Sequence, residues 1–486
     1  MKSLLKLTKD ANPNYLATIC KIGETFPIEN ADRLVKTVVN GYDIIISKEY
    51  KAGDIVVYFP VETSICEKYL SANNQYERGE FERNANAEEV KRLIEKAESA
   101  DEQSAAEYAA QIKSMCGFFN KNGRVRILKL RGQYSQGFIA NVDSLIKYNP
   151  SLKDEDWNEL VGTQFNFVGD EEFCWKYIPP VKVVHSGAGN QSFWKKRMKK
   201  LNRFDRIIAG QFTFHYDTKM LAEHIKELTP DDVVSITVKV HGTSVIIANV
   251  LCNRKLSVFE KVKKFLGFKV VEQEYGNVYS SRSVIKNQYI NPNAQSFYET
   301  DIWGCVNRDF GKFLTEGMTV YGEIAGYLED SDKMIQANHD YGCTRGHWKF
   351  MPYRISETDK DGNKTEWDVD KVYEWTKNLA LDHPEIAEKL MPINILYYGR
   401  LGDLYPDLDT TQHWHENLLA RMKNDKDKFL MELDEPLCKN KVPREGIVIR
   451  KVGDETARAW KLKTLRHYGK EAEAHDKDIT DIEETA

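Results

Sequence analysis

Charged residues interrupt several short runs of this sequence that otherwise suit buried β-strands. In VVSITVKV (233–240) polar and β-branched residues alternate, so Ser235, Thr237 and Lys239 share one strand face. The other charged positions lie in MTVYGEIAGY (318–327), REGIVIR (444–450) and AWKLK (459–463), and they are Glu323, Glu445, Lys461 and Lys463. Charges in such strands are costly unless they are paired or functional. The pattern predicts one polar cleft, with structural ion pairing as the alternative.

Lys239 stands directly before a tight turn. The sequence HGTS (241–244) supplies a glycine and two hydroxyls that can bond to backbone or to phosphate. A lysine three residues before a glycine is common by chance, and a lysine at a strand end is usually solvated. The turn becomes informative only together with the charges in the other strands.

The length of 486 residues exceeds what one core usually organises, so at least two domains are expected. Residues 1–180 contain short β-rich runs between turn residues, typical of a small barrel, with a helical insertion at about 77–115. A basic linker with interleaved aromatic residues follows at 181–207. It is interpreted either as a solvated amphipathic helix or as a segment that contacts nucleic acid. Residues 208–486 mix strands and helices. The predicted fold class is α+β, with antiparallel sheets and helices in the second domain.

Two local predictions concern the first domain. In the insertion, Asn86 and Glu89 have the spacing of a helix-capping box before AEEVKRLIEKA. RVRILKL (124–130) predicts a strand in which Arg124, Arg126 and Lys129 alternate with apolar residues. These cations form either a basic edge for a nucleic-acid duplex or a solvated outer face of the barrel.

Composition narrows the class of protein. The formal net charge of −5 provides no global positive field for nucleic acid, so a site for a polyanion must be local. The eight cysteines include no CxxC pair, which favours reduced thiols over a zinc ribbon or a disulfide scaffold. No apolar run is long enough for a membrane span and the start is unlike a signal peptide, so the expected location is cytoplasmic.

An ordered set of segments resembles a known family. It consists of KVHGTS (239–244), YSSR (279–282), YGEIAGY (321–327), KFMPYRI (349–355), REGIVIR (444–450) and WKLK (460–463). These segments resemble the covalent nucleotidyltransferase motifs of ATP-dependent polynucleotide ligases. GFFNKNGRVRILKLRGQYSQGFI (117–139) looks like the RNA ligase branch that carries an N-terminal OB domain. The tail after Lys463 is too short for an OB barrel, which DNA ligases and capping enzymes have there, so the RNA ligase branch is favoured.

The resemblance implies roles for particular residues. Lys239 would be the nucleophile that forms a lysine-AMP bond, and Lys461 and Lys463 would bind the α-phosphate and lower the pKa of Lys239. Glu323 and Glu445 would hold the water shell of Mg²⁺ or Mn²⁺, or ribose hydroxyls. The remaining ATP-binding residues implied by the motifs are Gly242, Arg282, which would contact phosphates, and Tyr353, which would stack on adenine.

His241 departs from the family pattern. Many ligases have an aspartate there that helps to organise the metal's waters, whereas an imidazole can contact water, ribose or phosphate instead. The other histidines, including His413 and His415, have no third ligand nearby in sequence and are interpreted as surface or packing residues.

The resulting prediction is an ATP-dependent RNA ligase for RNA repair or nick sealing. Its expected partner is RNA or an RNA-containing nicked duplex, with a monomeric chain and no membrane. Two alternatives stay open: a non-catalytic nucleic-acid-binding protein with relic motifs, and an enzyme that seals DNA or caps with GTP.

Overall fold

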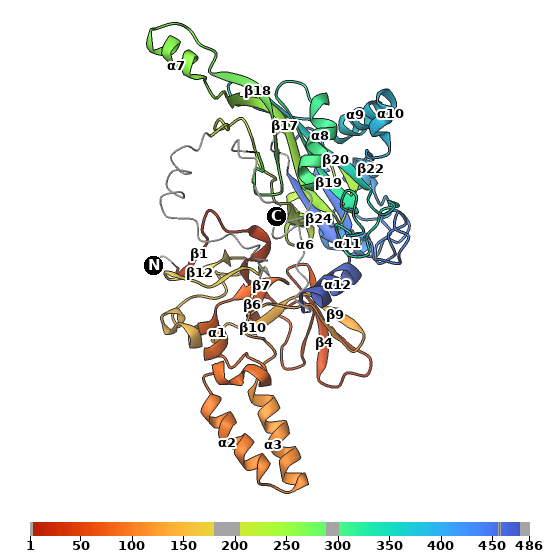
Figure 1. The fold of residues 1–486 in the computed structure, drawn as a ribbon. Coiled ribbons are helices and arrows are strands. Elements are labelled where there is room, and N and C mark those ends of the chain that lie inside the picture. The colour runs from red at the N-terminus through yellow and green to blue at the C-terminus, as the bar shows by residue number, and fades with distance from the viewer. Residues whose placement is uncertain (1–2, 179–204, 288–300, 455, 457, 477–486) are drawn as a thin grey trace. The chain divides into compact units, whose positions relative to one another are not determined.

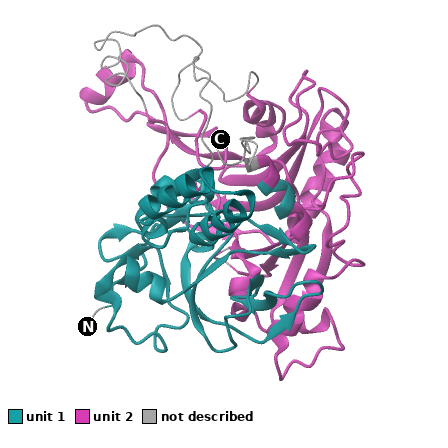
Figure 2. Ribbon diagram, turned by 90° about the horizontal axis from the view of Figure 1, so that it is seen from below, with its two compact units in different colours: residues 1–178, 468–472 teal, residues 179–467, 473–486 magenta. Residues whose placement is uncertain are grey.

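The computed structural model describes residues 3–178, 205–287, 301–454, 456 and 458–476 (Figure 1). It divides into two compact units, described separately below (Figure 2). Unit 1 is Met1–Ile178 with Tyr468–Ala472, and unit 2 is Pro179–His467 with Glu473–Ala486. The assignment of Tyr468–Ala472 to unit 1 differs from the predicted division, which left the whole C-terminal part in the second domain. The predicted linker at 181–207 lies outside the described residues except for its last three.

Unit 1 is built around a four-stranded antiparallel sheet in the order β10-β6-β2-β11. Its strands are β2 (Ala17–Lys21), β6 (Ile55–Phe59), β10 (Phe138–Asn141) and β11 (Gln164–Phe165). Alternate residues such as Ile19, Val57 and Phe59 are fully buried in its core. Four consecutive residues are buried in each of the central strands β2 and β6, so both faces of these strands are covered.

Smaller sheets and short helices complete unit 1. The strands are β1 (Leu5–Lys6), β12 (Phe167–Val168) and β13 (Glu171–Glu172); β3 (Thr25–Pro27), β4 (Leu34–Val39) and β5 (Tyr42–Ser47); β7 (Thr63–Ile65) with β14 (Cys174–Lys176); and β8 (Leu128–Leu130) with β9 (Gln133–Ser135). The helices are α1 (Glu67–Ala72) and α4 (Asp143–Tyr148), with 3₁₀ turns at Pro13–Tyr15, Arg78–Arg83 and Pro150–Leu152.

The strand predicted at 124–130 is wrong over its first half, because only Leu128–Leu130 is a strand. Arg124 is 3% exposed, lies 3.5 Å from a Glu62 carboxylate oxygen and sits over the ring of Tyr177. A guanidinium can be buried when a carboxylate and an aromatic face replace its water. Arg124 therefore does not contribute to an exposed basic edge.

The insertion folds as two antiparallel helices, α2 (Ala87–Glu98) and α3 (Glu102–Met115), which extend away from the sheets of unit 1 (Figure 1). Val90 and Leu93 pack against Ile112 in a small core of their own. The predicted capping box is wrong. The Asn86 side-chain amide instead donates to the Met115 carbonyl at 2.9 Å, which ties the start of α2 to the end of α3.

Unit 2 contains two five-stranded sheets. The first has the order β15-β24-β23-β16-β22 and consists of β15 (Lys219–Met220), β16 (Val233–Lys239), β22 (Ile395–Arg400), β23 (Gly446–Lys451) and β24 (Ala459–Lys463). The second has the order β18-β17-β19-β20-β21 and consists of β17 (Thr243–Asn253), β18 (Gln273–Ser280), β19 (Met318–Gly326), β20 (Trp348–Thr358) and β21 (Lys364–Glu366). All strand pairs are antiparallel except β15 with β24. The short turn between β16 and β17 thus connects the two sheets.

Helices α8 and α9 pack on the second sheet (Figure 1). Trp303 and Phe310 of α8 and Val372 of α9 share a buried core with Val320 and Phe350 of the sheet. The described helices of unit 2 are α6 (Leu221–His224), α7 (Val258–Phe265), α8 (Ile302–Phe310), α9 (Val369–Asp382), α10 (Pro384–Ala387) and α11 (Trp414–Lys423), with 3₁₀ turns at Ile225–Glu227, Gly311–Phe313 and Leu401–Asp403. Helix α12 (Leu465–Asp476) is divided between the units, because its residues Tyr468–Ala472 belong to unit 1. The predicted α+β class is confirmed.

The described helices and the cysteines can be compared with what the sequence predicted. Among the described helices, none is both long and apolar enough to cross a bilayer. All eight cysteines are free thiols.

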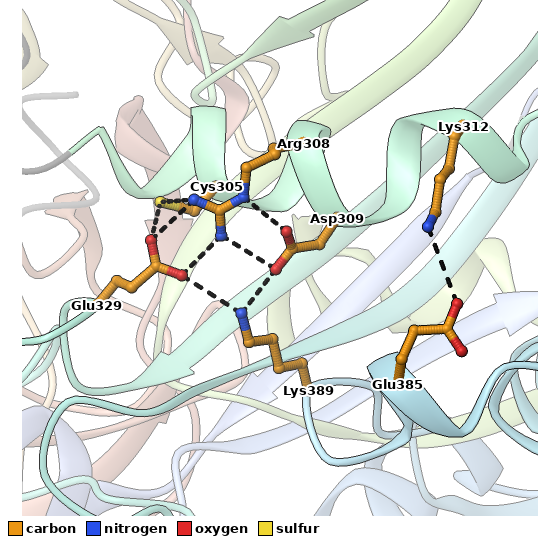
Figure 3. A network of polar contacts seen from close by, with 7 residues as sticks. All are labelled: Cys305, Arg308, Asp309, Lys312, Glu329, Glu385 and Lys389. Carbon is orange, nitrogen blue, oxygen red and sulfur yellow. Dashed lines mark hydrogen bonds and ion pairs between the residues drawn. The ribbon is translucent and has the colours of Figure 1, made fainter.

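A network of ion pairs connects α8 to the chain segments that follow β19 and α10 (Figure 3). The Glu329 carboxylate pairs with Arg308 at 2.7 Å and with Lys389 at 3.3 Å, and it accepts a hydrogen bond from the Cys305 thiol. Lys389 also pairs with Asp309 at 2.7 Å. The Arg308 hydrogen bond is the main reason that the pKa of Glu329 falls to about 2.

We expect Glu329→Gln to lower the free energy of unfolding by about 1 kcal/mol at neutral pH. The lowered pKa stabilises the folded chain above the carboxyl's unfolded pKa of about 4.3, and this contribution is lost as the pH falls toward about 2. Urea unfolding at several pH values measures the difference. Glu385→Gln is the matched control, because its carboxylate is 56% exposed and 3.9 Å from Lys312, so its effect should stay within about 0.5 kcal/mol. Equal effects of the two substitutions would contradict this account.

Candidate active site

Strand register brings two of the predicted lysines to one carboxylate. Lys239 at the end of β16 pairs with Gly446 of β23, and Gly446 pairs on its other side with Lys463 of β24. Glu445 directly precedes Gly446. Its Oε1 lies 2.8 Å from the Lys239 Nζ and 3.3 Å from the Lys463 Nζ.

Glycines allow the close approach of these strands. A Cβ at Gly446, whose φ is +151°, would lie 2.0 Å from the Leu462 carbonyl oxygen. A Cβ at Gly242 would lie 2.3 Å from the Ile324 carbonyl oxygen and 2.8 Å from the Cγ of Glu323. Any side chain at either position would push the strands apart, so both glycines are required by packing.

The Glu445 side chain is only 1% exposed. Burial raises its pKa, but the attraction of Lys239 and then of Lys463 outweighs burial and holds the pKa well below its usual range. The group is therefore a buried carboxylate that its cationic neighbours keep ionised.

A second buried ion pair lies next to Glu445 in the sequence and in the fold. Arg444 and Glu435 pair at 3.0 Å, with side chains 2% and 1% exposed. The Arg444 carbonyl accepts a hydrogen bond from the Thr464 hydroxyl at 2.7 Å, and the Thr464 N–H donates to the Glu445 carbonyl at 2.9 Å. The backbone on both sides of Glu445 is thereby fixed to the end of β24.

Glu323 lies next to the turn between the sheets. It is opposite Ser244 in the pairing of β17 with β19, and the Ser244 hydroxyl donates to its carboxylate at 3.4 Å. The carboxylate is nearly buried, at 6% exposure. Since Gly242 packs on its side chain, Glu323 borders the same turn that follows Lys239.

Lys461 shares a strand face with Lys463 and is buried. Burial, followed by repulsion from Lys463 and Lys239, lowers the pKa of Lys461 to about 7. Arg282 adds to this repulsion, and its own guanidinium pairs with Asp217. These cations therefore lie close enough to act on one another.

Tyr353 has different neighbours. It packs on a buried cluster that includes Val238 and Val240, the residues on either side of Lys239. Its ring stacks on His215 with centroids 5.3 Å apart, its hydroxyl is bonded to His215 Nε2, and the Arg450 guanidinium lies over it. Tyr353 is thus beside the strand that carries Lys239, with an aromatic partner of its own.

Three histidines gather at the turn, and sequence reasoning identified only His241. The His241 ring lies edge-on to His339 and His467, with centroids 4.7 and 4.8 Å away. Burial is the main reason that the pKa of His339 falls to about 4, so this ring is neutral. Neither His339 nor His467 has a spacing in the sequence that relates it to His241, so only the fold could bring them together.

Two side chains hold the turn in place. The Gln336 amide donates to the Gly242 carbonyl at 2.8 Å, and the His241 N–H donates to the Tyr341 hydroxyl at 2.8 Å. The loop that follows β19 therefore clamps the turn between the sheets.

The arrangement can bind an anionic group and present an amine to it. Lys239 and Lys463 meet at one buried carboxylate, Lys461 lies near both of these lysines, and Glu323 lies at the adjoining turn. A two-sheet α+β unit with this cluster of charged side chains, preceded by a β-rich unit, is the class of protein that the fold and the site define.

Comparison with protein families identifies both parts. Residues 232–463 match the model of the RNA ligase family, and residues 16–91 match an OB-fold domain model. Residues 232–463 therefore form an RNA ligase domain, and residues 16–91 lie in an N-terminal OB-fold domain, as the sequence predicted.

Solved structures of Naegleria gruberi RNA ligase are similar over nearly the whole chain. A mutant with ATP and Mn is 18% identical, with a TM-score of 0.48 and coverage of 96% of this chain and 99% of that chain. A mutant with AMP and Mn is 19% identical, with a TM-score of 0.48 and coverage of 93% and 98%. No curated protein sequence matches significantly.

We expect Glu435→Gln to destabilise the protein by about 3–5 kcal/mol, because it leaves the Arg444 guanidinium buried without its counter-charge. Denaturant unfolding measures this loss. The double variant Arg444→Met with Glu435→Leu should recover most of it, since both buried charges are then absent. A loss below about 1 kcal/mol for the single variant would contradict the role given to this pair.

Proposed function

We propose that this protein is an ATP-dependent RNA ligase that joins a 3′-OH end to a 5′-phosphate end through a lysine-AMP intermediate on Lys239. The observation that carries this proposal is the convergence of Lys239 and Lys463 on the buried Glu445 carboxylate. Nucleotidyl transfer depends mainly on positioning and on the stabilisation of charge, and this cleft supplies both.

In the first step the Lys239 amine attacks the α-phosphorus of ATP. A nitrogen–phosphorus bond forms, the bond to the β-phosphate oxygen breaks, and pyrophosphate leaves. The Lys239 ammonium first gives up a proton to solvent, and repulsion from the adjacent cations Lys461 and Lys463 favours this loss. The same two cations stabilise negative charge on the α-phosphate.

In the second step the AMP passes from Lys239 to the 5′-phosphate of an RNA end, which frees the amine and gives a 5′-5′ linked strand. In the third step a 3′-OH attacks that end phosphorus and expels AMP, leaving a phosphodiester bond. The proposed substrate is RNA or an RNA-containing nicked duplex, and the proposed role is RNA repair or nick sealing in the cytoplasm.

The donor set fits a divalent cation, Mg²⁺ or Mn²⁺. The Glu445 Oε2 is buried and finds no hydrogen-bond partner within the described part of the chain, and Glu323 adds a second carboxylate at the same turn. Such an ion supplies charge neutralisation at phosphate oxygens. Glu323 and Glu445 would hold it through oxygen atoms or through its waters.

Other predicted residues keep binding roles in this proposal. Arg282 contacts phosphates, which would compete with its present partner Asp217. Tyr353 stacks on adenine, in place of or opposite to the His215 ring. Gly242 allows the turn to pack against Glu323, and a side chain there would displace that carboxylate from the site.

The decisive experiment uses ATP labelled on the α-phosphate with Mg²⁺, after bound AMP has been removed with pyrophosphate. We expect label to remain on the denatured wild-type protein and to be absent from Lys239→Ala, because that variant lacks the amine that forms the proposed lysine-AMP bond. Lys377→Ala, which removes a half-exposed lysine on α9, is the control and should label fully. Joining of unactivated ends by Lys239→Ala would refute the assignment. The absence of label on wild type would favour a non-catalytic binding protein.

Lys461→Met separates catalysis from folding. The pKa of Lys461 is about 7 in the folded chain and about 10.4 when unfolded, so its contribution to stability rises with pH between these values. The substitution should remove that dependence and raise stability at pH 7 by about 1 kcal/mol or more, because a buried charge is lost. Lysine-AMP formation should fall about 100-fold with the lost phosphate contact. Thermal unfolding from pH 7 to 10 and the labelling assay measure the two effects, and a less stable variant would contradict this account.

A further inference from the structure

The histidine cluster has features that the proposed ligase reaction does not use. His241 Nδ1 lies 3.8 Å from the Glu445 Oε2, and His467 Nε2 lies 3.7 Å from the Glu445 Oε1. One ligand atom of each of these three residues lies within 4.8 Å of the others. Two imidazole nitrogens thus face one buried carboxylate.

The two oxygens of the Glu445 carboxylate have different neighbours. Lys239 and Lys463 both approach Oε1. The Oε2 and the His241 Nδ1 are buried and have no hydrogen-bond partner among the described residues, although they lie within ion-pair distance of each other. Buried polar atoms of this kind usually have a partner, so a group that bonds to both atoms at once is missing from the cluster.

We propose that His241, His467 and Glu445 directly ligate a divalent transition-metal ion that prefers nitrogen donors, of the series from Mn²⁺ to Zn²⁺. This inference rests on the proposed function in that it specifies the cation used by the same site. Imidazole nitrogen suits transition ions, whereas Mg²⁺ prefers oxygen ligands and keeps several of its waters. The site therefore favours Co²⁺, Zn²⁺ or Mn²⁺ over Mg²⁺.

The geometry needs only small side-chain movements. Atoms bound to one tetrahedral ion at about 2.1 Å lie about 3.4 Å apart, so ligand atoms that now lie within 4.8 Å of one another need to close by up to about 1.4 Å. The histidine backbones are already fixed, because the Tyr341 hydroxyl accepts from the His241 N–H and the Thr464 hydroxyl accepts from the His467 N–H at 3.2 Å. These bonds fix the backbone from which each imidazole projects.

His339 serves as packing in this arrangement. Its Nδ1 bonds to the Ala337 carbonyl at 2.9 Å, which makes Nδ1 the protonated nitrogen and sets the ring edge-on to His241. The His241 ring is therefore held between two other rings, His339 and His467. This confinement limits the rotation of a ligand side chain before the ion arrives.

The test titrates AMP-free full-length protein with Co²⁺ and records its visible absorption. Direct imidazole ligands at low coordination give a stronger band than the octahedral ion with oxygen ligands alone. We expect a saturable band on wild type and at least about tenfold weaker Co²⁺ binding for His241→Ala and His467→Ala. His347→Ala, which removes an exposed histidine outside the cluster, is the control and should bind like wild type.

Because His467 is 3% exposed, His467→Gln is measured beside His467→Ala, and circular dichroism checks that each variant is folded. His241→Asp should shift the preference from Co²⁺ toward Mg²⁺, since an oxygen donor replaces nitrogen. Equal Co²⁺ binding by wild type and both folded histidine variants would overturn the inference. Lysine-AMP labelling with Mg²⁺ on the same samples keeps the two proposals apart, because label without a histidine-dependent band refutes the metal site and leaves the ligase assignment intact.

Discussion

The buried Glu445 carboxylate is the group on which the rest of the site depends. Removing an ionised carboxylate from water costs several kcal/mol, and only close cations offset that cost. Lys239 and Lys463 supply them because strand register places both beside Gly446. The register in turn requires the missing side chain at Gly446, since a Cβ there would collide with the neighbouring strand. The absence of a side chain at Gly446 therefore permits the two strand pairings, and these pairings bring the two lysines to the Glu445 carboxylate.

The site holds more positive charge than its own carboxylates balance locally. Lys461 is buried beside Lys463 and Lys239, with Arg282 near enough to add repulsion, and its lowered pKa reports the resulting strain. A well-packed apolar residue in that strand would serve folding better. Buried like charges are retained where an external group of opposite sign completes the site, and a nucleotide phosphate has that sign. The repulsion among these cations would therefore be relieved when an anion binds beside them.

The period-2 pattern of the sequence was enough to predict which strands carry charge and that Lys461 and Lys463 share a face. Ordered motifs then identified the family, which the family comparisons confirm. The sequence could not predict contacts made by loops: His339 and His467 reach His241 only through the chain path after β19 and the start of α12. Arg124 was misplaced for a related reason, because its partners Glu62 and Tyr177 come from distant segments. Local pattern decides strand faces, whereas tertiary partners decide which charges are buried.

The two oxygens of Glu445 link the covalent chemistry to the histidine cluster. Oε1 faces the lysines, and Oε2 faces His241. A ligand that binds Oε2 therefore changes the negative charge on Oε1 next to Lys239, because both oxygens belong to one delocalised carboxylate. The ligand does not need to contact Lys239 itself. The turn between the sheets adds a mechanical link, since His241 and Gly242 follow Lys239 after a single residue and are held by hydrogen bonds to Tyr341 and Gln336. Metal preference and nucleophile position are thus set by the same short stretch of chain, and a change at His241 cannot alter one without acting on the other.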